Sequence, residues 1–276
     1  MQKIDAHQHF WVFDPVRDGW IDDTMPEIRR DFLPEDLGPI LQNNSFDGCV
    51  VVQSDQSEAE NIFQLKNAGK NSIVKGLVGW VDLCSPKVEE RLEYYRQFKL
   101  MKGFRHILQS EADASFMLQK SFMNGISKLQ KFGFAYDILI FPKQLENAKK
   151  LIENFPDQPF VIDHIAKPDI KNKTIDDWKK NIIAVSELEN VSCKVSGMVT
   201  EANWKNWKTA DFTPYLDVVF EAFGAKRVLF GSDWPVCNVA GGYEKMLSVV
   251  QHYTSTLAKN EQELFWGGNA VRFYDL

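Results

Sequence analysis

The chain has 276 residues, of which 44% are hydrophobic and 25% charged, and this is an ordinary globular composition. Its net charge of -6 argues against a nucleic-acid partner, because such a partner requires clustered lysine and arginine. No stretch approaches the roughly eighteen consecutive apolar residues of a membrane span, so a membrane partner is not expected either.

We expect a cytoplasmic protein, because no charged leader followed by an apolar run opens the chain. The cysteines are scattered and none forms a Cys-x-x-Cys pair, which indicates reduced core thiols of an intracellular protein rather than a disulfide framework. These cysteines are Cys49, Cys84, Cys193 and Cys237.

Eight short apolar, β-branched runs recur at fairly even intervals along the chain. Most are nearly continuous rather than alternating, which is typical of parallel strands buried on both faces. The predicted strands are Lys3–His9, Asp47–Gln53, Val74–Val81, Lys102–Ile107, Phe134–Ile140, Phe160–Ile165, Val191–Gly197 and Arg227–Asp233.

Helical patterns lie between these strands, and two of them follow Ser85-Pro86 and Thr213-Pro214, where a capping hydroxyl precedes a proline at the first helical position. No composition break marks a second domain. Eight alternations of strand and helix predict a single-domain (β/α)8 TIM barrel over residues 1–276, in preference to an open doubly wound sheet. The clearest predicted helices are Pro86–Phe98, Phe116–Lys131, Pro142–Phe155, Asp176–Leu188 and Pro214–Phe223.

The first connection is long, running from Phe10 to about Asn44 and carrying Trp20. A loop of this length at the C-terminal end of a strand is usually functional or a lid. An elaborated connection that covers the barrel mouth without chemistry is the alternative. Its prolines are Pro15, Pro26, Pro34 and Pro39.

The segment Ile4-Asp5-Ala6-His7-Gln8-His9 predicts a strand that ends in two imidazoles. Residues two apart on a strand point to the same side, so His7 and His9 project into one space. Two convergent neutral imidazoles suit a divalent metal. A His-x-His motif alone is short, and two surface or hydrogen-bonded histidines are an equally good interpretation of it.

Further polar residues fall at the predicted strand ends, where barrels of this kind place their catalytic groups. Four of the five histidines lie there, and His252 falls in a late helical pattern. Scattered structural histidines are not expected to concentrate in this way. The residues at the strand ends are His7, His9, Gln53, Trp80, Arg105, His106, Asp163, His164 and Asp233.

These residue types predict metal-assisted hydrolysis. Two or three imidazoles and a carboxylate hold a divalent ion while leaving a position for water, whose pKa the metal lowers. Asp233 is a candidate ligand and a candidate general base. Arg105 offers a planar fork for a carboxylate or an oxyanion, with a buried salt bridge as the alternative. Only one of the neighbours Asp163 and His164 can point into the barrel from a strand, and we expect it to be His164.

The segment Ile4–Trp11 resembles the opening of the amidohydrolase-2 branch of the amidohydrolase superfamily, and is similar to its sugar lactonases of the L-fuconolactonase and L-rhamnonolactonase type. The resemblance implies a (β/α)8 barrel, hydrolysis of an aldonolactone to its open acid, and metal ligands at His7, His9, His164 and Asp233. Further matching segments are Gly76–Leu83, Lys102–Ile107, Tyr136–Ile140, Asp163–Pro168, Lys194–Gly197, Phe230–Pro235 and Gly267–Tyr274.

The chain departs from the binuclear members of that superfamily, which also use a bridging Lys or Glu at the end of strand four and a His at the end of strand five. Here strand four offers Arg105-His106, and strand five ends Asp137–Ile140 without a histidine. We therefore expect one divalent metal. Imidazole and carboxylate suit zinc, while manganese or iron also fit. Some relatives in this branch hydrolyse lactones without a metal, so a site that requires none stays open.

The leading hypothesis is hydrolysis of a small sugar lactone. Metal-bound or Asp233-activated water attacks the ring carbonyl, Arg105 or His106 stabilises the oxyanion, and a protonated His106 helps the ring oxygen leave. The candidates for binding the sugar are Trp11, Gln53, Trp80 and Arg105.

Two alternatives remain. A metal-dependent decarboxylase on the same barrel would hold an aromatic or unsaturated acid with Arg105 and would release carbon dioxide. A non-catalytic sugar- or metal-binding protein is disfavoured, because binding alone does not require His7, His9, His164 and Asp233 together. The sequence carries no signal for an oligomeric state.

Overall fold

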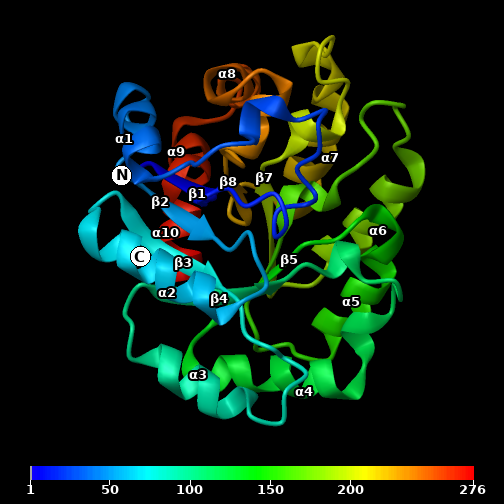
Figure 1. Cartoon of the computed structure of the whole chain (residues 1–276). Coiled ribbons are helices and arrows are strands. Elements are labelled where there is room, and N and C mark those ends of the chain that lie inside the picture. The colour runs from blue at the N-terminus through cyan, green and yellow to red at the C-terminus, as the bar shows by residue number, and fades with distance from the viewer. Residues whose placement is uncertain (1) are drawn as a thin grey trace.

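Eight parallel strands follow one another in chain order around a central ring (Figure 1). The computed structural model describes residues 2–276. The ring closes between the first and last strands, where the His9 amide donates to the Trp234 carbonyl (2.7 Å) and the Asp233 amide to the His7 carbonyl (2.8 Å). The predicted single-domain (β/α)8 barrel is confirmed. The strands are β1 (Ile4–Gln8), β2 (Gly48–Val52), β3 (Val74–Gly79), β4 (Met101–His106), β5 (Ala135–Ile138), β6 (Phe160–Ile162), β7 (Val191–Val195) and β8 (Val228–Phe230).

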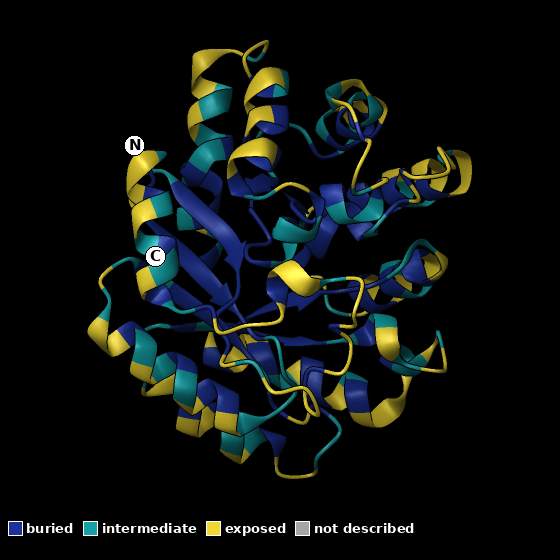
Figure 2. Ribbon diagram, turned by 45° about the horizontal axis from the view of Figure 1, so that its top comes forward, coloured by how far each residue is buried: buried dark blue, intermediate teal, exposed yellow. Residues whose placement is uncertain are grey.

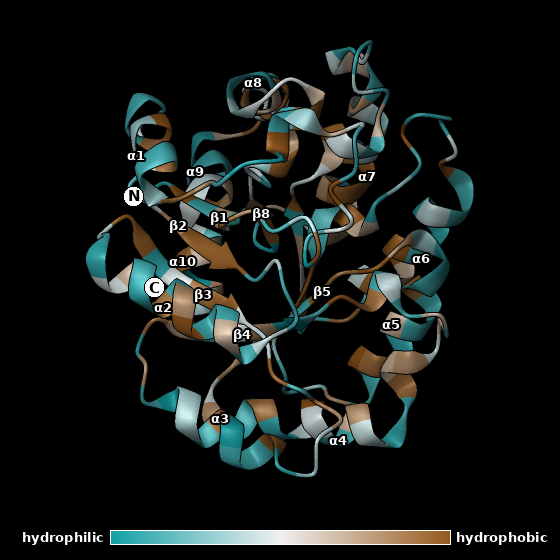
Figure 3. Ribbon diagram, viewed as in Figure 1, coloured by the Kyte–Doolittle hydropathy of each residue, from teal (hydrophilic) through white to brown (hydrophobic). Residues whose placement is uncertain are grey.

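Helices surround this ring, with buried residues on the faces toward the strands and exposed residues outside (Figure 2). The hydropathy of the ribbon follows the same division (Figure 3). On α4, for example, Phe122, Ile126 and Leu129 are buried at helical spacing. The helices are α1 (Pro34–Asn43), α2 (Glu58–Lys70), α3 (Val88–Arg96), α4 (Lys120–Leu129), α5 (Leu145–Glu153), α6 (Asp176–Ser186), α7 (Thr213–Phe223), α8 (Tyr243–Thr254), α9 (Lys259–Glu263) and α10 (Asn269–Tyr274).

The two capping predictions are wrong. Helix α3 begins only at Val88, and the Ser85 hydroxyl accepts the Lys87 amide (3.2 Å) in the turn before it. Helix α7 begins at Thr213 itself, because a short 3₁₀ turn over Thr209–Asp211 already brings the backbone close to helical geometry. A capping residue needs an extended backbone, which Thr213 therefore lacks.

The segment from Phe10 to Asn44 is not a single long loop, because α1 occupies Pro34–Asn43. Pro34 stands in the first turn of the helix, where its missing N–H costs nothing, and the Asp36 carboxylate accepts the Leu33 amide (2.9 Å). What remains is an irregular connection over residues 10–33. It carries aromatic side chains to the C-terminal end of the barrel, where the site lies.

The interior of the ring changes from apolar to charged along the strands. Aliphatic residues such as Ile4, Val50 and Leu229 form a cluster with α10, which closes the N-terminal end. On β4 and β5 the residues Phe104 and Tyr136 pack against aromatic rings of α3 and α4. The alternation along a strand therefore directs their neighbours, Arg105 among them, to the inside.

The four cysteines, which all lie within the described part of the chain, are free. Cys49, Cys193 and Cys237 are buried and Cys84 is half-buried. The prediction that they form no disulfide framework is confirmed.

Candidate active site

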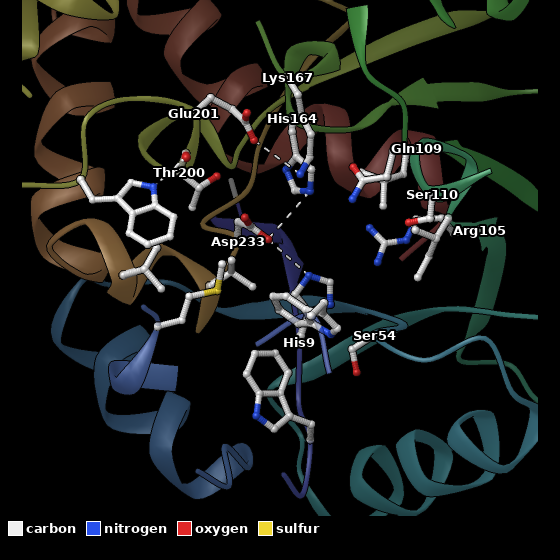
Figure 4. Close-up of a pocket in the computed structure, with 18 residues that line it drawn as sticks. His9, Ser54, Arg105, Gln109, Ser110, His164, Lys167, Thr200, Glu201 and Asp233 are labelled. Atoms are coloured by element: carbon white, nitrogen blue, oxygen red, sulfur yellow. Dashed lines mark hydrogen bonds and ion pairs between the residues drawn. The ribbon is translucent and has the colours of Figure 1, made fainter. Parts of the chain in front are cut away.

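Three imidazoles converge on one carboxylate at the C-terminal end of the barrel. The Nε2 atom of His9 lies 3.3 Å from Asp233 Oδ1, and the Nε2 atoms of His7 and His164 each lie 3.9 Å from the same oxygen. All four side chains are buried, and Figure 4 shows His9 and His164 linked to Asp233 from two sides. The structure thus brings together the four residues predicted as metal ligands.

Strand β1 contains a bulge at Ala6 and His7, and the ordinary alternation that follows it keeps His7 and His9 on the same side. The register against β2 shifts between Asp5 and Gln8, so that Ala6 and His7 together lie opposite Val50. Bulges of this kind re-aim side chains beside active sites.

Two glycines give these imidazoles the room they need. A Cβ atom on Gly231 would stand 2.5 Å from the Cβ of His7, and one on Gly197 would stand 2.5 Å from Nδ1 of His164. Gly197 also has a φ of +59°, in the left-handed region that glycine adopts without strain.

His164 and Lys167 are the first and last residues of a left-handed turn that follows β6. The φ angles of His164, Ile165, Ala166 and Lys167 are 54°, 48°, 57° and 51°. Each such residue costs about 1–2 kcal/mol relative to the right-handed form. The turn is held by the Lys167 amide, which donates to the His164 carbonyl (2.8 Å), and by the Trp178 indole, which donates to the Ile165 carbonyl (2.7 Å).

The prediction that only one of Asp163 and His164 points into the barrel is wrong. It assumed strand geometry, whereas β6 ends at Ile162 and both residues lie beyond it. The Asp163 carboxylate accepts a hydrogen bond from the Arg105 guanidinium (3.0 Å), while the His164 ring lies 4.4 Å from that of His7.

The imidazoles of His7 and His164 are neutral and the Asp233 carboxylate is ionised. Burial lowers the pKa of His164 to about 4 and that of His7 well below its ordinary value. Burial alone would raise the pKa of Asp233, but the surrounding His164, His9 and His7 hold it well below its ordinary value. These are the protonation states that a divalent metal requires of its ligands.

The donor set fits a divalent metal. His9 Nδ1–H donates to the Val52 carbonyl (2.7 Å) and Nδ1 of His164 is hydrogen-bonded to the Ser196 hydroxyl (2.9 Å), so that Nε2 of each ring is the atom nearest Asp233. Donors of a tetrahedral zinc site lie about 3.3 Å apart. The donor atoms of His7, His164 and Asp233 lie within 4.8 Å of one another, and His9 Nε2 lies 3.3 Å from Asp233 Oδ1. Against this, a guanidinium nitrogen of Arg105 lies 3.3 Å from Nε2 of His7 and places a positive charge beside that ligand.

A buried charge network lies beneath these imidazoles, and sequence reasoning missed its central lysine. Lys194 is fully buried, and its Nζ lies 2.5 Å from Asp137 Oδ2, 3.1 Å from Asp163 Oδ1 and 3.2 Å from Nδ1 of His7. Its ammonium therefore occupies the centre of the second potential metal-ligand group, which is formed by His7, Asp137 and Asp163.

Arg105 and Trp11, two of the residues predicted to bind substrate, line the pocket beside this cluster. Gln53 and Trp80 lie outside the set of described residues that line it. The Gln53 amide donates to the Arg105 carbonyl (3.2 Å), and the Gln53 carbonyl accepts from the Arg105 guanidinium. Trp80 follows the end of β3, where Asn61 binds its backbone N–H and carbonyl.

His106, the predicted proton donor, faces the helices. Its ring stacks on Phe116 at 5.2 Å between centroids, and its Nε2 lies 2.7 Å from Glu111 Oε1. Adjacent strand residues point to opposite sides, and because Arg105 faces inward His106 faces outward. The geometry therefore does not support contact between His106 and a substrate in the pocket.

The pocket has a volume of about 300 Å³. It mixes indole and aliphatic walls with hydroxyl, amide and charged groups. Lys167 belongs to a segment that already carried the family resemblance, whereas most of the others stand on loops without any periodic pattern that could have marked them. The lining residues that sequence reasoning did not propose include Trp20, Ser54, Gln109, Ser110, Lys167, Thr200, Glu201 and Trp204.

Residues 4–276 match the family model described as Amidohydrolase (Amidohydro_2). The chain belongs to the amidohydrolase-2 family. It is 35% identical to an L-fucono-1,5-lactonase of Burkholderia multivorans, over 99% of this chain and 96% of that protein. It is 24% identical to an L-rhamnono-gamma-lactonase of Scheffersomyces stipitis, over 75% of this chain and 70% of that protein.

A crystal structure of an amidohydrolase from Burkholderia multivorans with bound zinc is similar over 100% of both chains, with a TM-score of 0.95 and 34% sequence identity. The family resemblance inferred from the sequence is confirmed, and this amidohydrolase is an enzyme of the hydrolase class. Within residues 2–276, none of its helices combines the length and apolar character needed to cross a membrane.

Proposed function

We propose that this amidohydrolase hydrolyses a small sugar lactone, of the L-fucono-1,5-lactone type, to its open-chain aldonic acid. The observation that carries the proposal is the ionised Asp233, which lies among the three imidazoles of His7, His9 and His164 and lines a pocket of about 300 Å³. That volume is at the small end for ligand pockets, which suits a single sugar ring. The 35% identity to an L-fucono-1,5-lactonase supports the same substrate class.

His7, His9, His164 and Asp233 would hold one divalent metal, and zinc is favoured because a structure 34% identical to this chain contains it. Such an ion lowers the pKa of a water molecule and polarises a carbonyl group. Asp233 takes the proton of the attacking water, since it is the ionised carboxylate that faces the pocket. Because His106 faces away, the Asp233 carboxyl also returns that proton to the ring oxygen as the ring opens.

Arg105 stabilises the negative charge that develops on the carbonyl oxygen. Its guanidinium is held by Asp163 and by the Gln53 carbonyl, so its position is fixed before substrate binds. Its Nε is a buried donor without a hydrogen-bond partner among the described residues, and a lactone oxygen would satisfy it.

The aromatic wall of the pocket binds the less polar face of the sugar. Trp11 is fixed by a hydrogen bond from its indole N–H to the Arg30 carbonyl (2.9 Å) and by edge contact with Trp20, at 6.0 Å between centroids. Trp204 is fixed similarly, through the Thr200 carbonyl (2.8 Å). Rigid indoles can therefore contact the C–H groups of the ring, while Ser54, Gln109 and Ser110 offer hydrogen bonds to its hydroxyls.

The test is acid release, followed with a pH indicator, on L-fucono-, L-rhamnono- and D-galactono-type lactones with and without a chelator. We expect turnover of at least one lactone series, and a loss of rate with chelator that zinc restores. Absence of acid release across the panel would refute the proposal. Release of carbon dioxide from an aromatic acid would replace it with the decarboxylase alternative.

The variant Asp233→Asn tests the role of the carboxylate. We expect turnover to fall by about 10²–10⁴-fold, the range for loss of a general base. Asp177→Asn, on the exposed surface of α6, is the matched control and should keep wild-type turnover. Near-full activity of Asp233→Asn would remove Asp233 from the mechanism.

A further inference from the structure

Lys167 and Glu201 form an ion pair in the wall of the pocket, and neither residue has a role in the reaction proposed above. Lys167 Nζ lies 3.5 Å from Glu201 Oε1, and the two side chains are 17% and 20% exposed. They come from different connections, the one after β6 and the one after β7. Figure 4 shows them directed toward each other beside His164 and Asp233.

Fold stability does not account for this arrangement. A partly exposed ion pair stabilises a fold only weakly. The left-handed turn that ends at Lys167, by contrast, destabilises the fold at each of its four residues. The turn continues beyond His164 through Ile165 and Ala166 to Lys167, which also lines the pocket. Backbone strain of this kind gathers where a side chain must reach a functional position.

The chemistry of the pair is complementary to two neighbouring hydroxyl groups. An ammonium only donates hydrogen bonds, and an ionised carboxylate only accepts them. Two adjacent hydroxyls can present an oxygen lone pair to the first and an O–H to the second. The pair is neutral in sum, so it does not favour a charged substituent at this place.

We propose that Lys167 and Glu201 together bind two adjacent hydroxyl groups of the lactone and thereby select hydroxylated rings over unsubstituted ones. The inference rests on the proposed lactonase function. A ring without these hydroxyls leaves the carboxylate and the ammonium without hydrogen bonds in a largely buried wall, and sites built to bind a hydroxyl reject analogues that lack it strongly. Thr200, whose hydroxyl donates to the Gly197 carbonyl (2.6 Å), borders the same place.

The experiment compares the best aldonolactone of the panel with the unsubstituted lactone of the same ring size. Lys167→Met and Glu201→Gln each remove one charge and keep the side-chain length. We expect the preference for the hydroxylated lactone, measured as a ratio of kcat/KM values, to fall roughly a hundredfold in each variant, mainly through KM. The controls are Lys180→Met and Glu187→Gln, at exposed positions of α6 and its C-terminal end.

Equal losses on both lactones, or no loss on either, would overturn the proposal. Calorimetry with 1,5-anhydro-L-fucitol, the sugar ring without a carbonyl, gives an answer that needs no turnover. Weaker binding to both variants than to the wild type supports the proposal, and equal binding or none to the wild type overturns it. Failure of the proposed lactonase function is a separate result, namely a wild type that is inert on every lactone.

Discussion

Replacement of Lys194 by methionine tests whether the charges inside the barrel hold one another in place. Four of them, on Lys194, Arg105, Asp137 and Asp163, sum to zero, and the Lys194 ammonium lies 2.5 Å and 3.1 Å from the two carboxylates. Methionine keeps most of the side-chain volume but leaves one buried negative charge uncompensated. Removal of one partner from a buried ion pair costs about 3–5 kcal/mol, and we expect a loss of this size in the free energy of unfolding.

The assay is urea unfolding together with thermal melting at pH 8. Burial raises the pKa of Asp137 to about 6, and at pH 8 its carboxyl is ionised. At about 2–4 °C per kcal/mol, the expected fall in Tm is about 6–20 °C. The control is the double variant Lys194→Met/Asp137→Asn, which restores the charge balance and should recover most of the loss. A loss below about 1 kcal/mol, or a double variant as unstable as the sum of both single ones, would refute the reasoning.

Two further predictions concern positions next to the imidazoles. Gly197→Ala should lower turnover at least tenfold, because the added Cβ would lie 2.5 Å from Nδ1 of His164. The control is Gly133→Ala, which is also at positive φ but has no atom within 4 Å of the added Cβ, and it should lower Tm without lowering turnover. Equal turnover in both variants would contradict this. Burial raises the pKa of Asp5 from 3.8 to about 6, so the folded state binds its proton more tightly. Asp5 should therefore contribute a fall of about 3 kcal/mol in the free energy of unfolding as pH rises from about 4 to about 6, and the total fall should be smaller by that amount in Asp5→Asn. Urea unfolding across that range measures it, and an identical decline in the variant would contradict the assignment to Asp5.

The barrel could be predicted because its strands are buried on both faces. Continuous apolar runs such as Val50–Val52 and Phe160–Ile162 are typical of parallel strands that are buried on both faces. The even spacing of these runs leaves room for one helix between each pair of strands. The ends of the parallel strands then gather at one edge by topology alone. His7, His9 and Asp233 could be placed together on that basis without knowledge of any contact.

Strand periodicity did not determine which side chains at the strand ends enter the pocket. Arg105 and His106 lie within β4, and there the alternation that turns one inward turns the other outward. The sequence shows that one of them must face the helices but not which one. Trp80 stands one residue beyond β3 and Asn61 binds its backbone, a contact that joins residues far apart in the chain and leaves no local pattern.

The left-handed turn after β6 shows why the pocket itself could not be derived. Ile165 is β-branched and would be assigned to a strand by any local preference, yet its φ is 48°. It keeps that conformation because Trp178 of α6 binds its carbonyl and Ser196 beyond β7 binds the amide and ring of His164. Tertiary contacts thus impose the backbone that brings His164 and Lys167 to one wall. A loop sequence therefore reveals its pocket residues only when the elements that hold the loop are known.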